Sequence, residues 1–149
     1  MATTQASYSV IPLPEAAAPA AQTGFGLGTE AGARGRVYVR RDLEIGSFGV
    51  NAFYQAASGE IVVGEHDELA PGASGHEELY AVFSGHALFT IAGGEVDAPA
   101  GTFVYVSDPL AQRKAVAKAA DTVIVSLGGW VGKAFEPSDW ETESLVPDA

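Results

Sequence analysis

The sequence lacks cysteine altogether, and this absence excludes both disulfide bridges and thiolate metal sites. It also has few basic residues, with 8 Lys and Arg against 19 Asp and Glu and a net charge of −11. We therefore expect neither nucleic acids nor anionic membranes as partners, because both attract clustered positive charge. The acidic balance mainly indicates solubility.

Long apolar runs are missing as well. No stretch approaches the roughly 18 uninterrupted apolar residues of a membrane span. The first 22 residues have neither a basic start nor a continuous apolar segment, so they do not resemble a secretory signal. We therefore expect a cytoplasmic protein, and the absence of cysteine agrees with that location.

Helical periodicity is also absent, because no apolar pattern with a 3.6-residue period extends over ten residues. The chain instead shows short β-rich runs separated by Gly and Pro, which is typical of a sandwich, barrel or jelly roll. The expected strands are Arg36–Leu43, Phe48–Ala56, Glu60–His66, Leu79–Phe83, Ala87–Ala92, Thr102–Val106, Arg113–Ala117 and Thr122–Leu127. We predict an all-β protein, and the 149 residues are enough for one domain.

The two ends of the chain differ from this pattern. Residues 1–33 are rich in Ala, Pro, Gly and Thr, and we expect a flexible or surface-packed N-terminal arm. The tail, Gly128–Ala149, places Trp130 and Phe135 among acidic residues, as expected for a segment that covers the mouth or edge of a barrel. The predicted organisation is therefore the arm followed by a β-barrel with a C-terminal covering tail over 34–149.

Two stretches resemble the paired motifs of the cupin family. Glu78–Gly85 has the family's glutamate, six residues and glycine, and Pro71-Gly72 resembles the turn that leads into that strand. Gly101–Pro109 followed by Gln112 resembles the second motif, in which a glycine, five residues and a Pro-x-Gly turn precede a histidine. The resemblance covers roughly Glu60 to Leu127. It implies a single cupin-type jelly-roll β-barrel with its binding site inside.

The chain also departs from the family's metal-binding pattern. The His-x-His pair that precedes the glutamate in metal-binding cupins is absent, and the nearest candidates are His66 and Glu68. Gln112 occupies the place of the second motif's histidine. The resemblance therefore implies a metal set of His66, Glu68, Glu78 and Gln112, for a divalent transition metal that the sequence does not choose among Fe, Mn, Cu, Ni and Zn.

Glu68 and Glu78 would strongly affect each other in one pocket. At about 5 Å and an effective dielectric near 20, the two carboxylates repel by roughly 3 kcal/mol. They must take up a cation, share a proton or stay apart. A histidine with two carboxylates can hold a divalent metal. Without a metal, His66 or His76 beside Glu78 could act as a general base, because the carboxylate orients the ring and raises its pKa.

Strand alternation places His76 and Tyr80 on the face of Glu78. We therefore expect His76, Tyr80 and Val104 to line a substrate pocket, and His66, Glu78 and Tyr80 to be the candidate catalytic residues.

Three functions stay open at this stage. The first is a metal-dependent oxygenase, isomerase or lyase that acts on a small organic molecule. The second is a metal-free module that binds or senses a small molecule. The third is a non-catalytic dimeric scaffold. The residues do not decide whether the protein is an enzyme. We also expect a homodimer, because the basic group Arg34, Arg36 and Arg40 could pair with the acidic tail of a second subunit.

Overall fold

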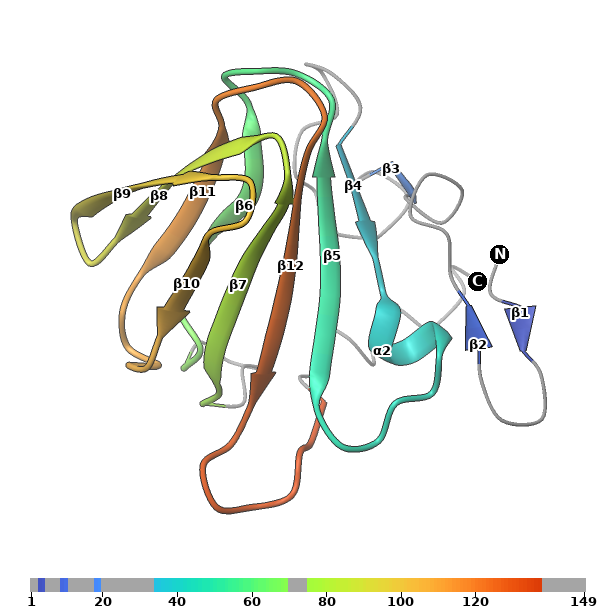
Figure 1. Ribbon diagram of the computed structural model, residues 1–149. Helices are drawn as coiled ribbons and strands as arrows, with labels where there is room; N and C mark the ends of the chain where they lie inside the picture. The colour runs from blue at the N-terminus through green and yellow to red at the C-terminus, as the bar shows by residue number, and fades with distance from the viewer. Residues whose placement is uncertain (1–2, 5–8, 11–17, 20–33, 70–74, 138–149) are drawn as a thin grey trace, which may run out of the picture.

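Two antiparallel β-sheets pack face to face and enclose the core (Figure 1). The structure is a computed structural model, and it describes residues 3–4, 9–10, 18–19, 34–69 and 75–137. The prediction of an all-β barrel is confirmed. Most of the expected arm lies outside the described residues.

The larger sheet has the strand order β10-β7-β12-β5-β4-β3. Its strands are β3 (Ala18–Pro19), β4 (Arg34–Val37), β5 (Gly49–Gln55), β7 (Glu77–Ser84), β10 (Phe103–Val106) and β12 (Thr122–Gly129). The smaller sheet has the order β6-β11-β8-β9. Its strands are β6 (Ile61–His66), β8 (His86–Ile91), β9 (Gly94–Pro99) and β11 (Arg113–Ala117). A separate two-stranded pair joins β1 (Thr3–Thr4) to β2 (Ser9–Val10).

The expected strand Arg36–Leu43 is wrong in its second half. Strand β4 ends at Val37, and a short helix, α2 (Val39–Asp42), follows it. The reason is local, because three consecutive charged residues interrupt the alternation that a strand needs. The backbone N–H of Leu43 donates instead to the carbonyl oxygen of Val39 at 3.0 Å and closes a helical turn. None of the described helices combines the length and hydropathy that crossing a membrane requires.

The inner face of the larger sheet changes from apolar to polar along its strands. Three rows of inward-facing residues cross β5, β12 and β7 in register. These rows are Phe53–Ile124–Val82, then Asn51–Ser126–Tyr80, then Gly49–Gly128–Glu78. The first row belongs to the hydrophobic core. The polar groups therefore collect at one end of the barrel.

Two glycines at this polar end leave room for large side chains. A Cβ atom on Gly49 would lie 3.0 Å from the ring of Phe135. One on Gly128 would lie 3.2 Å from the carbonyl oxygen of Glu77, with Cγ of Glu78 at 3.5 Å and Cβ of His76 at 3.7 Å. The His76 ring packs against Phe135 and Trp130, with centroids 5.0 and 5.4 Å apart respectively. The segment after β12 thus covers this end of the barrel, while the rest of the tail lies outside the described residues.

The basic residues of β4 contact the barrel itself. Arg34 donates to the carbonyl oxygen of Val62 at 3.3 Å, and the Arg36 guanidinium lies 4.7 Å from the ring centre of Phe53. Most of the acidic tail expected to pair with these residues in a second subunit, residues 138–149, lies outside the described part of the chain. The homodimer stays a prediction.

Gly85, the glycine that closes the first motif, is held in a conformation that other residues rarely adopt. Its φ is +74°, and an added Cβ would lie 2.7 Å from the Cα of Thr122, a fully buried residue. Gly93 has a similar φ of +83°, but nothing lies within 4 Å of its added Cβ.

We predict that Gly85→Ala lowers the free energy of unfolding by about 3 kcal/mol, because backbone strain and a backbone clash add together. Gly93→Ala should cost only about 1 kcal/mol, because strain acts alone. Chemical denaturation measures both values. Equal losses in the two variants would show that the contact with Thr122 does not constrain the fold.

Candidate functional site

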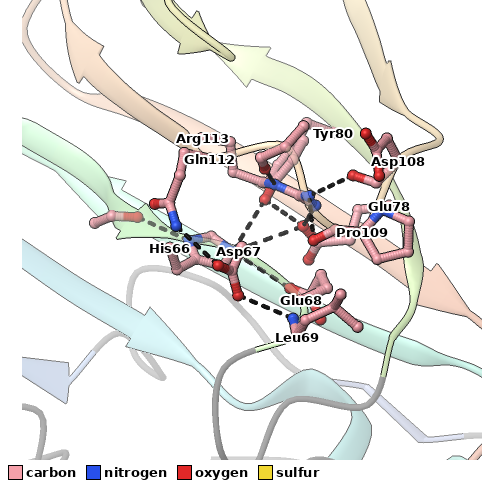
Figure 2. Close-up of polar contacts among 12 residues, drawn as sticks. His66, Asp67, Glu68, Leu69, Glu78, Tyr80, Asp108, Pro109, Gln112 and Arg113 are labelled. Carbon is pink, nitrogen blue, oxygen red and sulfur yellow. Dashed lines mark hydrogen bonds and ion pairs between the residues drawn. The ribbon is translucent and has the colours of Figure 1, made fainter.

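A cluster of polar side chains joins the end of β6 to β7 inside the polar end of the barrel (Figure 2). The Nε2 atom of His66 lies 3.4 Å from Oε1 of Glu68 and 3.7 Å from Oε2 of Glu78. The Tyr80 hydroxyl donates to the same Glu78 oxygen at 2.5 Å. The imidazole nitrogen and the two carboxylate oxygens all lie within 4.8 Å of one another. The structure thus brings together three of the four residues expected as metal ligands.

Arg113 completes this cluster, although the sequence analysis did not propose it. It is the first residue of β11 and lies opposite His66 in the ladder between β11 and β6. Its guanidinium is completely buried and donates to Oε2 of Glu78 at 2.8 Å. The remaining donors contact the carbonyl oxygens of Ala111 and Asp108, each at 2.9 Å. Arg113 is therefore fixed at both ends, against the backbone and against Glu78.

The structure places Gln112 outside the cluster. Its amide donates to Oδ2 of Asp67 at 2.8 Å on the exposed side of β11 (Figure 2). The expected register is therefore displaced by one residue, and Arg113 contacts Glu78 in place of Gln112. A usable signal was present, because Arg113 shares strand parity with Ala115 and Ala117, whereas Lys114 has the opposite parity.

The other expected pocket residues occupy different environments. The hydroxyl of Tyr80 belongs to the cluster, while its ring packs against Phe89 in the core. Val104 is a core residue. His76 is buried beneath Trp130 and Phe135, next to the strand that carries Glu78. Among the three residues expected to line a pocket, Tyr80 is therefore the one whose polar group is hydrogen-bonded to the cluster.

The pKa values of Glu68 and Glu78 are shifted in opposite directions. Burial acts most strongly on both and favours the protonated form. It raises the pKa of Glu68 despite the opposing effect of His66. At Glu78 the hydrogen bonds and charges of His66, together with Tyr80 and Arg113, exceed the effect of burial and lower the pKa. Glu78 is therefore the firmly ionised carboxylate, and Glu68 is the one closer to accepting a proton.

The histidine between them carries a proton readily. Burial on its own lowers the pKa of His66, but the carboxylates of Glu68 and Glu78 outweigh it and raise the pKa to about 10. The Nδ1–H group donates to the carbonyl oxygen of Gly64 at 2.8 Å, which fixes the ring and directs Nε2 at the carboxylates. With Arg113, the cluster contains two positive and two negative groups.

The positive charge of Arg113 beside Glu78 determines how well these residues fit a metal. Zinc, for example, lies about 2.0–2.2 Å from its nitrogen and oxygen ligands. An ion on Oε2 of Glu78 would therefore lie within about 4 Å of the Arg113 guanidinium. Their repulsion would be roughly 8 kcal/mol at an effective dielectric near 20. The group His66, Glu68 and Glu78 is present, but it does not fit a divalent metal while Arg113 holds Glu78.

Comparisons with known proteins support the fold and no closer relationship. Neither a family model nor a curated protein matches the chain. An uncharacterised double-stranded β-helix protein from Klebsiella pneumoniae is similar in structure, with a TM-score of 0.56, 18% identity, and coverage of 87% of this chain and 96% of that one. A cupin protein from Bacteroides fragilis gives a TM-score of 0.54, 18% identity, and coverage of 76% and 89%. KdgF from a Halomonas species gives a TM-score of 0.52, 14% identity, and coverage of 72% and 81%. The chain therefore has a cupin-type fold.

Exchanging Arg113 for a ligand should open the site to metals. We predict that Arg113→His binds Co²⁺ at least about tenfold more tightly than the unaltered protein, or about 1.4 kcal/mol, because the repelling charge leaves and an imidazole enters. Gln112→His is the matched control and should bring no gain, because its side chain lies beside Asp67. Titration followed by Co²⁺ absorption measures the affinities.

The stability of the Arg113→His variant provides an internal check. Without metal it should lose about 3 kcal/mol, because a buried carboxylate loses its partner, and Co²⁺ should restore part of the loss. Tighter binding by Gln112→His than by Arg113→His would contradict the observed register.

Proposed function

We propose that this protein is a metal-independent cupin that binds a small organic molecule beside His66 and Glu68. The observation that carries the proposal is the buried ion pair between Arg113 and Glu78, with the guanidinium fully enclosed and 2.8 Å from the carboxylate. The chain itself thus supplies the positive charge that two neighbouring carboxylates require. Of the metal-free alternatives, binding agrees better with the structure than a plain scaffold, because polar groups inside a barrel are costly to bury.

The accessible part of the cluster is the part that would meet a ligand. The side chain of His66 is 35% exposed, whereas that of Arg113 is fully enclosed. In this proposal Arg113 and Tyr80 hold Glu78 ionised, and Glu78 helps to hold the His66 ring in place. His66 donates a hydrogen bond to the ligand, and Glu68 accepts one. If the bound molecule reacts, these two residues are placed to move a proton.

A metal-dependent enzyme is the second candidate. The convergence of His66, Glu68 and Glu78 within 4.8 Å favours it. It requires the Arg113 guanidinium to leave Glu78, which means breaking a buried, hydrogen-bonded ion pair. A cost of about 3–5 kcal/mol is typical when a buried ion pair loses one partner. We therefore rank this candidate below the metal-independent one.

Two measurements on one preparation test the proposal. Protein produced in medium containing Fe, Mn, Cu, Ni and Zn should carry far less than one equivalent of any of them by elemental analysis. A thermal-shift screen of sugars, phenols and small carboxylic acids should reveal a stabilising compound, worth about 2.7 kcal/mol at 100 times its dissociation constant. His66→Gln and Glu68→Gln should each weaken binding of that compound at least about tenfold.

The control is His86→Gln, because His86 lies on β8 and pairs with the exposed Asp97. This variant should bind as the unaltered protein does. A full equivalent of tightly held metal would instead support the metal-dependent candidate. A compound whose binding survives both His66→Gln and Glu68→Gln would place the binding site elsewhere.

A further inference from the structure

A second polar group lies inside the barrel next to the cluster and takes no part in it. Asn51 on β5 and Ser126 on β12 are each 7% exposed, and they face Tyr80 in one row across the sheet. The Oδ1 atom of Asn51 is buried and has no hydrogen-bond partner in the part of the chain that the structure describes. The amide therefore faces the barrel interior with an unused acceptor.

The unpartnered oxygen of Asn51 has an energetic cost, and that cost suggests that the residue has a role besides packing. A buried polar atom without a partner typically costs about 1–3 kcal/mol. The adjacent row, Phe53–Ile124–Val82, shows that the same sheet fills its interior with apolar side chains elsewhere. A leucine at position 51 would have the same number of non-hydrogen side-chain atoms and no such cost. Unsatisfied groups of this kind call for an explanation, and a ligand is one that fits a barrel interior.

The position of Asn51 relates it to the proposed binding site. Neighbouring strands lie about 4.8 Å apart, so Asn51 is about 10 Å from Tyr80 across β12. The Tyr80 hydroxyl lies 3.4 Å from Nε2 of His66. Asn51 and Tyr80 therefore lie in one row on the inner face of the sheet, and the span from Asn51 to the cluster is within the length of one small molecule.

We propose that Asn51 and Ser126 form a subsite for an uncharged hydroxyl group of the ligand, whose other end is bound by His66 and Glu68. The proposal rests on the proposed function and defines its ligand class as small hydroxylated molecules. An amide and a hydroxyl carry no charge, and a buried carboxylate, phosphate or ammonium group would lack a counter-ion in this row. A ligand hydroxyl can donate to the Asn51 oxygen and accept from the Ser126 hydroxyl.

The test pairs a change in the protein with a change in the ligand. Neutral monosaccharides are screened by ligand-observed NMR, and the monodeoxy analogues of the best binder are then titrated by calorimetry. One analogue should bind the unaltered protein at least about tenfold more weakly, because the subsite loses its partner. Asn51→Leu should bind the parent sugar as weakly, and it should not distinguish the parent from that analogue. This non-additivity identifies the contact.

A control and a stability measurement separate this role from a structural one. Tyr54→Phe alters the outward face of the same strand, where Tyr54 bonds Asp121, and should leave sugar binding unchanged. Asn51→Leu should raise the melting temperature by about 2 °C or more, because the unpartnered amide is removed. A lower melting temperature would mean that the amide stabilises the fold and would overturn the proposal.

The remaining outcomes distinguish the subsite from the proposed function. If His66→Gln abolishes sugar binding while Asn51→Leu leaves it intact, the subsite is wrong and the proposed function stands. If no neutral monosaccharide binds the unaltered protein but a compound from the wider screen does, the hydroxylated ligand class is wrong. If nothing binds in either screen, both proposals fail.

Discussion

The buried contact between Arg113 and Glu78 determines the character of this barrel. Two carboxylates, Glu68 and Glu78, point into a protein interior from which water is largely excluded. Such a pair needs a compensating positive charge, and a bound metal is one way to supply it. Here a guanidinium supplies it, anchored to backbone carbonyl groups and fully enclosed. The two carboxylates raise the pKa of the histidine between them to about 10, so His66 adds a second positive group to the cluster.

The rest of the barrel is arranged around this polar end. Along β5, β12 and β7 the interior changes from a closely packed apolar row to polar groups and then to two glycines. The glycines leave space for the Glu78 and His76 side chains and for the Phe135 ring that covers the end. Stability is concentrated in the apolar part, whereas the polar part contains groups that no apolar core would require. A polar region beside an apolar core is expected where residues are selected for function and not for stability.

The sequence predicted most of the strands and part of the site for physical reasons that can be named, but it missed the helix that follows β4. The family resemblance suggested His66 and Glu68 as partners of Glu78, and the structure brings the three side chains together. Arg113 was missed because a shift of one residue moves a side chain to the opposite face of a strand, and the turn before β11 departs from the family pattern. Asn51 could not be identified, because a single asparagine in a strand gives no sign that its amide lacks a partner.

Anomalous diffraction from crystals soaked in Co²⁺ tests the central claim most directly. We predict Arg113 electron density in contact with Glu78, at about the observed 2.8 Å, and no anomalous peak between His66 and the two carboxylates. An anomalous peak within bonding distance of His66 and Glu78, with the guanidinium displaced, would contradict it.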